Sequence, residues 1–276
     1  MDQPSQGEQG RSLAQAVVTA LALLAIVVVC YLLGRTAFFF LAVTVVLLAL
    51  FELLDALVQR GHRPNVPFGV LCGFGLMGVA YLEKPALLAV VVAATAFGSM
   101  LLALRPNRGP TPGTDAAWTV FAVVWVGGGG AGAVSILMIE PQDGTFLLIA
   151  TFLSIALGDI AAYFIGTRFG KHKMAPTISP KKSWEGFFGG AAGSLAGGAL
   201  FAGLLYDLSL PAGLGIGLIV AALAPAGDLV ESLAKRELGI KDSGRLLPGH
   251  GGFLDRLDAI IFCCPVVYLF LRFIVF

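Results

Sequence analysis

One stretch of this chain, residues 228–258, carries most of the side chains that could do chemistry. It reads DLVESLAKRELGIKDSGRLLPGHGGFLDRLD and contains six acidic residues, five basic residues and one histidine, although only 13% of the whole chain is charged. A charged side chain at the centre of a bilayer costs roughly 3 kcal/mol. Such a density of charge between two apolar runs indicates that the stretch either lies outside the membrane or serves a functional site, and we expect a metal and phosphate site at the membrane surface.

Spacing within this stretch places polar side chains on one face of a helix. Asp228, Ser232 and Lys235 follow one another at i, i+4 and i+7, and Arg236 is four residues after Ser232. We therefore expect a carboxylate, a hydroxyl and two cations to point one way from the end of the preceding apolar run.

Asp255 and Asp258 add two carboxylates on one helical face, at the start of the last apolar run. Carboxylates at one membrane depth repel one another unless a cation joins them, and ligation by oxygen alone favours Mg²⁺ held partly by substrate phosphates. The preceding turn, residues 248–252, is rich in glycine, so the backbone can approach a ligand closely. His250 in this turn could act as a base, ligate the metal or only form a hydrogen bond, because one histidine is weak evidence for a metal.

A second candidate cluster lies upstream, where Asp159, Tyr163 and Gly166 are spaced at i, i+4 and i+7. A carboxylate within a membrane span is a candidate functional residue, and a structural role with a partner on another helix is the alternative. Asp159 and Tyr163 are therefore candidates for the same site.

The third candidate cluster is the segment SPKKSWEG. Ser179 could cap the next helix with a proline in its first turn, which would place Lys181 and Lys182 beside free backbone N–H groups at a helix N-terminus. Such an arrangement binds phosphate. The alternative is a solvated basic loop that sets the membrane topology or touches anionic lipid head groups.

The composition is that of an integral membrane protein. Of 276 residues, 57% are hydrophobic, and the mean hydropathy is +0.88, which exceeds the values of ordinary soluble domains. The net charge of +1 gives no indication of a nucleic-acid partner, and we expect none. The four cysteines lie inside apolar runs, so we interpret them as small buried side chains.

Apolar runs of roughly 20 residues, long enough to span a bilayer as helices, follow one another along the chain. They predict an all-α bundle of about nine transmembrane helices, at Leu13–Leu33, Thr36–Val58, Val66–Leu82, Pro85–Leu104, Ala116–Ile139, Thr145–Gly166, Trp184–Tyr206, Pro211–Leu233 and Leu257–Phe276. Residues 1–12 are expected to be a disordered cytoplasmic tail, residues 13–115 N-terminal transmembrane helices, and residues 116–276 C-terminal transmembrane helices with the catalytic site. The first four spans are nearly free of buried polar groups, whereas glycine becomes dense from residue 126 onward, which predicts close helix packing there.

The distribution of Lys and Arg predicts that the N-terminus is inside and the C-terminus outside. With nine spans in that orientation, fifteen Lys and Arg residues fall in cytoplasmic segments, and only Arg35, Lys84 and Arg272 fall outside. This bias follows the positive-inside rule. All three candidate clusters would then face the cytoplasm from a multi-pass protein of the cell inner membrane.

The longest motif string resembles the signature of the phosphatidate cytidylyltransferases, also called CDP-diacylglycerol synthases. The string consists of Ser232, Lys235-Arg236, Lys241-Asp242, PGHGG at 248–252, Asp255-Arg256 and Asp258, with the spacing kept throughout. The upstream segments GD..AY..G, GKHK and SPKKSWEG are also similar, so the resemblance covers residues 158–258. Ala234 departs from the family pattern, which usually has a bulkier apolar residue there.

The resemblance implies a reaction in which CTP and phosphatidic acid give CDP-diacylglycerol and pyrophosphate. The lipid phosphate would attack the α-phosphorus of CTP in line, with Mg²⁺ required and K⁺ often involved. Family members also tend to form homodimers in the lipid bilayer.

The resemblance also implies roles for individual residues. The metal would be held by Asp228, Asp255 and Asp258. The residues expected to take part in catalysis are Ser232, Lys235, Arg236, His250 and Asp255. The residues expected to bind substrate are Ser179, Lys181, Lys182, Lys241, Gly251, Gly252 and Arg256. Asp159 would complete the site or orient a lysine, and Tyr163 is a further candidate.

Two alternative functions stay open on the sequence alone. A relative that uses CTP on another membrane lipid, such as a polyprenol kinase or cytidylyltransferase, would be expected to depart from the HGGxxDRxD string that this chain keeps. A transporter would hold its carboxylates near the bilayer midplane and show inverted repeats.

Overall fold

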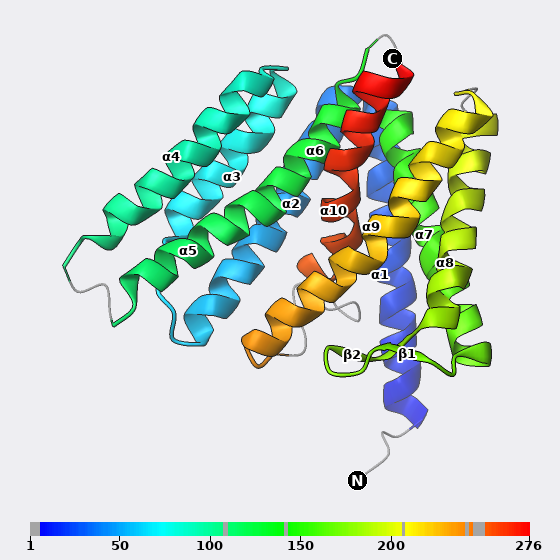
Figure 1. The fold of residues 1–276 in the computed structure, drawn as a ribbon, viewed down its shortest axis with the longest axis horizontal. Helices are drawn as coiled ribbons and strands as arrows, with labels where there is room; N and C mark the ends of the chain where they lie inside the picture. The colour runs from blue at the N-terminus through cyan, green and yellow to red at the C-terminus, as the bar shows by residue number, and fades with distance from the viewer. Residues whose placement is uncertain (1–5, 107–109, 141–142, 206–207, 241–242, 245–251) are drawn as a thin grey trace.

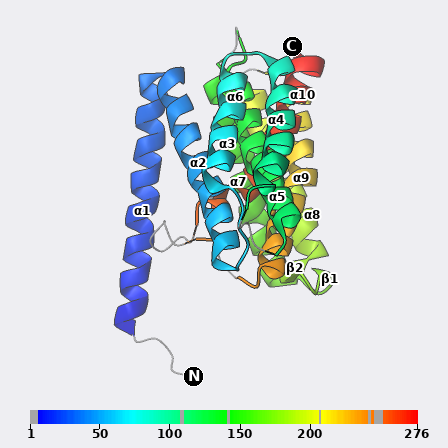
Figure 2. The same cartoon turned by 90° about the vertical axis from the view of Figure 1, so that its left-hand side faces the viewer.

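The structure, a computed structural model, describes residues 6–106, 110–140, 143–205, 208–240, 243–244 and 252–276, with side chains described from residue 18 onward. Within these residues the chain forms a bundle of helices and a small hairpin (Figure 1). Figure 2 shows the same bundle after a quarter turn. In both views the start of α1 and the end of the last helix lie at opposite ends of the bundle.

The helices follow one another in chain order. They are α1 (Gln6–Leu33), α2 (Arg35–Gln59), α3 (Val66–Tyr81), α4 (Pro85–Ala103), α5 (Pro112–Ala122), α6 (Gly128–Leu137), α7 (Gly144–Phe169), α8 (Trp184–Gly197), α9 (Leu210–Glu237) and α10 (Leu254–Phe270). The π-helical turns η1 (Val123–Gly127), η2 (Gly198–Leu204) and η3 (Leu271–Val275) continue α5, α8 and α10. The strands β1 (Lys173–Ala175) and β2 (Ser179–Ser183) form an antiparallel hairpin between α7 and α8.

Each apolar run predicted as a span coincides with a helix that the structure describes. Seven helical segments are long and apolar enough to cross a membrane, namely α2, α4, α5 through α6, α7, α8 with η2, α9, and α10 with η3. The helix α3 and the apolar part of α1 described from Val18 are shorter. The chain is therefore a helical protein with several membrane-spanning segments, whereas the number of crossings and their orientation remain predictions.

The first helix begins earlier than the sequence led us to expect. It starts at Gln6, inside the segment predicted to be a disordered tail. Once a helix is nucleated, each added residue gains a backbone hydrogen bond, and Gln, Glu and Arg are good helix formers. The polar residues before the apolar run therefore continue the helix.

The prediction that Ser179 caps the next helix is wrong. Ser179 pairs with Ala175 in the hairpin, and α8 begins only at Trp184. The N-cap is Ser183, whose hydroxyl accepts the N–H of Gly186 at 3.2 Å. Because strand pairing keeps the chain extended past the predicted start, the two lysines after Ser179 lie on a strand and not in a helical turn.

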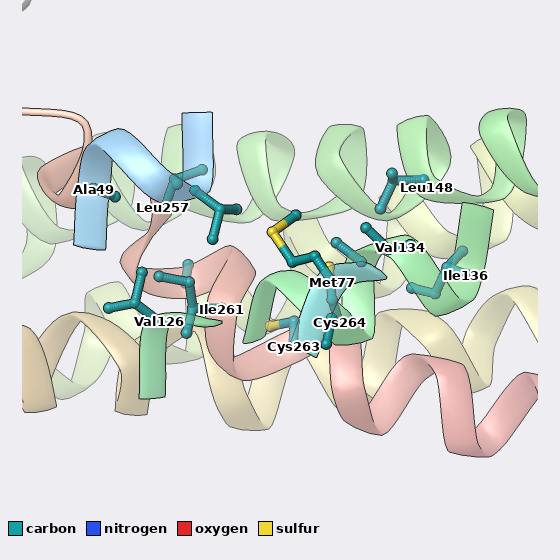
Figure 3. Packing of buried hydrophobic residues seen from close by; sticks show 14 of the residues in the cluster. Ala49, Met77, Val126, Val134, Ile136, Leu148, Leu257, Ile261, Cys263 and Cys264 are labelled. Carbon is teal, nitrogen blue, oxygen red and sulfur yellow. The ribbon is translucent and has the colours of Figure 1, made fainter. Parts of the chain in front are cut away.

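The helix α10 runs through the buried core (Figure 3). Its Ile261, Cys263 and Cys264 pack among Met77 of α3 and Val126 of η1. The two cysteines are 0% exposed, as expected of small buried side chains. This packing holds α10 firmly at the centre of the bundle.

Glycines bring α6 and α10 into close contact, as the glycine-rich second half predicted. A Cβ atom on Gly129 would lie 2.7 Å from the Cα of Ile261, and a Cβ atom on Gly132 would lie 2.6 Å from the backbone nitrogen of Pro265. Side chains at these positions would push the helices apart. The position of α10 is therefore set by backbone contacts.

Candidate functional site

Three carboxylates meet where α9 and α10 lie side by side. Asp228 and Glu231 come from α9 and Asp258 comes from α10, and one carboxylate oxygen of each lies within 4.8 Å of the other two. Asp228 and Asp258 are partly exposed, whereas Glu231 is 2% exposed. Negative charges this close to one another repel, so the cluster calls for a neutralising cation.

A glycine allows the two helices to approach at this point. Gly227 directly precedes Asp228, and a Cβ atom on it would lie 2.5 Å from the carbonyl oxygen of Asp258. Only a residue without a side chain permits this backbone contact. Gly227 therefore determines how closely the carboxylates of α9 and α10 can meet.

Lys182 brings a cation from the hairpin to the edge of the cluster. Its Nζ lies 2.6 Å from Oδ2 of Asp228 and 3.5 Å from the carbonyl oxygen of Pro225. The neighbouring Lys181 is exposed, since successive side chains on a strand point to opposite faces. Lys182 therefore contacts the carboxylate cluster, whereas Lys181 lies on the opposite, exposed face of the strand.

Asp159 of α7 belongs to the same electrostatic group. Its carboxylate interacts with the charges of Asp228, Asp258 and Lys182. Tyr163, one turn further along α7, is 67% exposed, so its side chain is turned to the outside of the bundle. Of the two candidates on α7, the structure therefore brings only Asp159 to the cluster.

Lys235 links two carboxylates from different helices. Its Nζ lies 3.1 Å from Oε1 of Glu231 and 3.0 Å from Oδ1 of Asp255. Ser232, on the same helix, donates from its hydroxyl to Oδ1 of Asp228 at 3.4 Å. The predicted face of α9 is therefore present, with its cation and hydroxyl in contact with acidic partners.

Asp255 organises the backbone ahead of α10. Its carboxylate accepts the N–H of Gly252 at 2.9 Å and the N–H of Ser243 at 3.3 Å, in addition to the ammonium of Lys235. The oxygens of Asp255 are thus engaged by these donors. The carboxylate that lies close to Asp228 and Asp258 is that of Glu231. That Asp255 ligates the metal therefore remains a prediction from the sequence.

The other predicted residues lie around this centre. The Nε of Arg236 donates to the carbonyl oxygen of Ile178 at 3.4 Å and so ties the end of α9 to the hairpin. Ser179 is half-buried on β2, and Arg256 is exposed in the first turn of α10. Three predicted residues lie outside the described part of the chain: Lys241, His250 and Gly251.

Two carboxylates near this centre were not singled out by the sequence. Glu231 is not among the residues predicted for the site, although its position three residues after Asp228 and four before Lys235 places it on the same helical face. Glu52 of α2 is 5% exposed and is an exception to the expectation that the first spans hold few buried polar groups. No local spacing signals Glu52, because its partner, the N–H of Leu254, is 202 residues away.

The arrangement can do one kind of chemistry well. Carboxylate oxygens of Asp228, Glu231 and Asp258 suit a hard divalent cation, which in turn binds phosphate oxygens. The ammonium groups of Lys182 and Lys235 lie beside this cluster and can neutralise further negative charge. The site therefore suits a divalent cation together with a phosphate-bearing substrate.

The sequence matches the model of the cytidylyltransferase family over residues 14–274. It is similar to the phosphatidate cytidylyltransferase of Mycobacterium bovis, with 35% identity over 274 residues that cover 91% of this chain and 86% of that protein. The protein of the same name from Mycobacterium tuberculosis is also 35% identical, over 91% of this chain and 80% of that protein. The one from Brucella suis is 43% identical over 141 residues, which cover 50% of this chain and 51% of that protein.

Proposed function

The chain belongs to the cytidylyltransferase family, and we propose that it transfers the cytidylyl group of CTP to phosphatidate. The products are CDP-diacylglycerol, a precursor for phospholipid synthesis, and pyrophosphate. Similarity to phosphatidate cytidylyltransferases over most of the chain supports this activity. The observation that carries the site is the meeting of Asp228, Glu231 and Asp258 beside two lysines.

The donor set fits Mg²⁺. Mg²⁺ prefers oxygen ligands and retains positions for water and substrate phosphates, and the cluster offers carboxylate oxygens from three residues. Asp228, Glu231 and Asp258 would hold the ion. In this set Glu231 replaces Asp255, which the family resemblance implied as a ligand. Bound there, Mg²⁺ would neutralise charge on the nucleotide phosphates and polarise the phosphorus that is attacked.

The protein's own groups position the two substrates and balance their charge. An oxygen of the phosphatidate phosphate forms a bond to the α-phosphorus of CTP, the bond from that phosphorus to the bridging oxygen of the β-phosphate breaks, and pyrophosphate leaves with the electron pair. A phosphate monoester is already nucleophilic at neutral pH, so no strong base is needed. Lys182 and Lys235 stabilise the negative charge that develops in this step, and Arg236 holds the hairpin that carries Lys182.

The site is expected to face the cytoplasm, where CTP is available. The positive-inside distribution of Lys and Arg supports this orientation. The start of α1 and the end of the last helix lie at opposite ends of the bundle, as an N-in, C-out arrangement requires (Figure 1). Phosphatidate would enter from the bilayer with its phosphate at the membrane surface. Placement in the cell inner membrane, a requirement for K⁺ and assembly into a homodimer are further parts of the proposal.

The experiment that tests the function measures CDP-diacylglycerol and pyrophosphate formed by the purified protein in detergent with CTP, phosphatidate and Mg²⁺. The variant is Asp258→Asn, which removes one charge from the cluster. The matched control is Glu140→Gln, an exposed acid between α6 and α7 that pairs with Arg35. Wild-type and control protein should make both products, and Asp258→Asn should make almost none. No lipid nucleotide from folded wild-type protein would refute the function, whereas full activity in Asp258→Asn would refute the site.

A further inference from the structure

A buried carboxylate from the N-terminal half contacts the start of the helix that carries Asp255 and Asp258. The Oε2 atom of Glu52, on α2, accepts the backbone N–H of Leu254 at 3.1 Å. Glu52 is 5% exposed, so it lies within the bundle and away from solvent. Burial of a carboxylate is costly unless hydrogen bonds compensate it, which indicates a specific role at this position.

Among the described residues, this contact takes the place of an N-terminal cap for α10. Leu254 is the first residue of α10, and the first N–H groups of a helix have no partner within the helix. The N-cap residue, Phe253, makes no side-chain capping hydrogen bond. A carboxylate at a helix N-terminus is stabilising because it also balances the positive end of the helix dipole. Glu52 therefore does from another helix what a capping side chain usually does locally.

Two glycines fit closely around the same carboxylate. A Cβ atom on Gly244 would lie only 2.5 Å from the Cδ of Glu52, and a Cβ atom on Gly252 would lie 2.7 Å from its Oε2. Gly252 also donates its backbone N–H to the carboxylate of Asp255. The backbone before α10 is thus held from two sides, by Glu52 from α2 and by Asp255 from α10 itself.

We infer that Glu52 is a positioning residue, which fixes the start of α10 and thereby the placement of Asp255 and Asp258 for cytidylyl transfer. In this assignment Glu52 acts through its hydrogen bond to the backbone of Leu254 and not by contact with substrate. The expected effect of Glu52 on cytidylyl transfer rests on the proposed function. Its role in fixing the start of α10 does not. Partners that orient the ligands of a site typically change activity about 10- to 100-fold when they are removed.

The first test is hydrogen exchange of the protein without nucleotide or metal. Protection of the backbone amides at the start of α10 should fall roughly ten-fold in Glu52→Ala, as expected for the loss of a hydrogen bond to a charged group, while α7 and α8 keep theirs. Glu52→Gln, which retains an acceptor oxygen at the same reach, should keep the protection. Asp55→Ala is the matched control, since Asp55 lies one turn further along α2 and bonds Gln59 instead. Unchanged exchange in Glu52→Ala would overturn the inference, whether or not the protein makes CDP-diacylglycerol.

The second test measures kcat and KM. Glu52→Ala should lower kcat about 10- to 100-fold with little change in the KM for CTP, and Glu52→Gln should restore most of kcat. Glu52→Asp keeps the charge but is one methylene shorter, so it should lose activity in the same way and serves if the alanine variant does not fold. Wild-type kcat in the alanine or the aspartate variant would overturn the inference.

A double-mutant cycle separates contact from general damage. Gly244→Ala should lower activity in the wild type, because the new methyl group collides with Glu52, and should add little in the Glu52→Ala background, where the colliding atoms are gone. Equal losses in both backgrounds would show that Glu52 does not hold this backbone. If neither the wild type nor any variant makes CDP-diacylglycerol, but hydrogen exchange at the start of α10 changes as expected in Glu52→Ala, the proposed function is refuted and the positioning role stands.

Discussion

Replacing Gly227 with alanine tests whether the close approach of α9 and α10 makes the site. The new Cβ atom would lie 2.5 Å from the carbonyl oxygen of Asp258, 3.1 Å from its carbonyl carbon and 3.2 Å from the Cα of Ala259. These are backbone atoms, which cannot rotate away as a flexible side chain can. Ordinary contacts begin at 3.4 Å, so the helices must separate by about 0.9 Å.

That displacement acts directly on the distance between Asp228 and Asp258. A misplacement of about 1 Å in an active site costs on the order of 10²-fold in rate. We therefore expect kcat/KM for CTP to fall about 10²-fold in Gly227→Ala. Alanine is a better helix former than glycine by about 1 kcal/mol, so α9 itself should remain helical.

The assay is CDP-diacylglycerol formation from CTP and phosphatidate in detergent, with thermal unfolding measured in parallel. Gly128→Ala is the matched control, because this helical glycine has open space where its Cβ atom would lie. The control should keep wild-type activity and stability. Activity of Gly227→Ala within about three-fold of the wild type would refute the reasoning that this glycine sets the distance between the carboxylates.

Three further predictions concern the charges and the metal. Lys182→Met should lower kcat/KM for CTP by about 10²-fold in the same assay, because it removes the cation 2.6 Å from Asp228; an unchanged rate would remove Lys182 from the site. Ser232→Ala should cost less than about ten-fold, since its hydrogen bond to Asp228 is long at 3.4 Å, and a larger loss would mean that Ser232 contacts substrate. Removal of divalent cations by a chelator should abolish product formation, and added Mg²⁺ should restore it; chelator-resistant activity would contradict the metal site.

Local patterns in the sequence were sufficient for the class of fold and for one face of the site. An apolar run of about 20 residues is a property of a contiguous segment, and the described helices coincide with the runs predicted. Helical periodicity likewise placed Asp228, Ser232 and Lys235 together, since residues four and seven apart share a face. The family assignment made from the motif string is confirmed by the match over residues 14–274.

Tertiary contacts decided which of these side chains meet. The pleat of β2 turns Lys182 toward Asp228 and leaves Lys181 exposed, which depends on a hairpin that the spacing of SPKKSWEG did not indicate. The packing of α9 against α10 brings Glu231 close to Asp258, whereas the carboxylate of Asp255 accepts hydrogen bonds from backbone N–H groups.

Glu52 shows the same division most clearly. Its buried carboxylate and the N–H of Leu254 are 202 residues apart in the chain, and no periodicity joins two segments at that separation. Apolar spans, helical faces and the motifs of the family can be recognised in the sequence because each is a pattern within a contiguous segment. The choice of carboxylates at the site and the cap of α10 depend on how distant helices pack, and they emerge only in the folded protein because packing is set by the fit of whole surfaces.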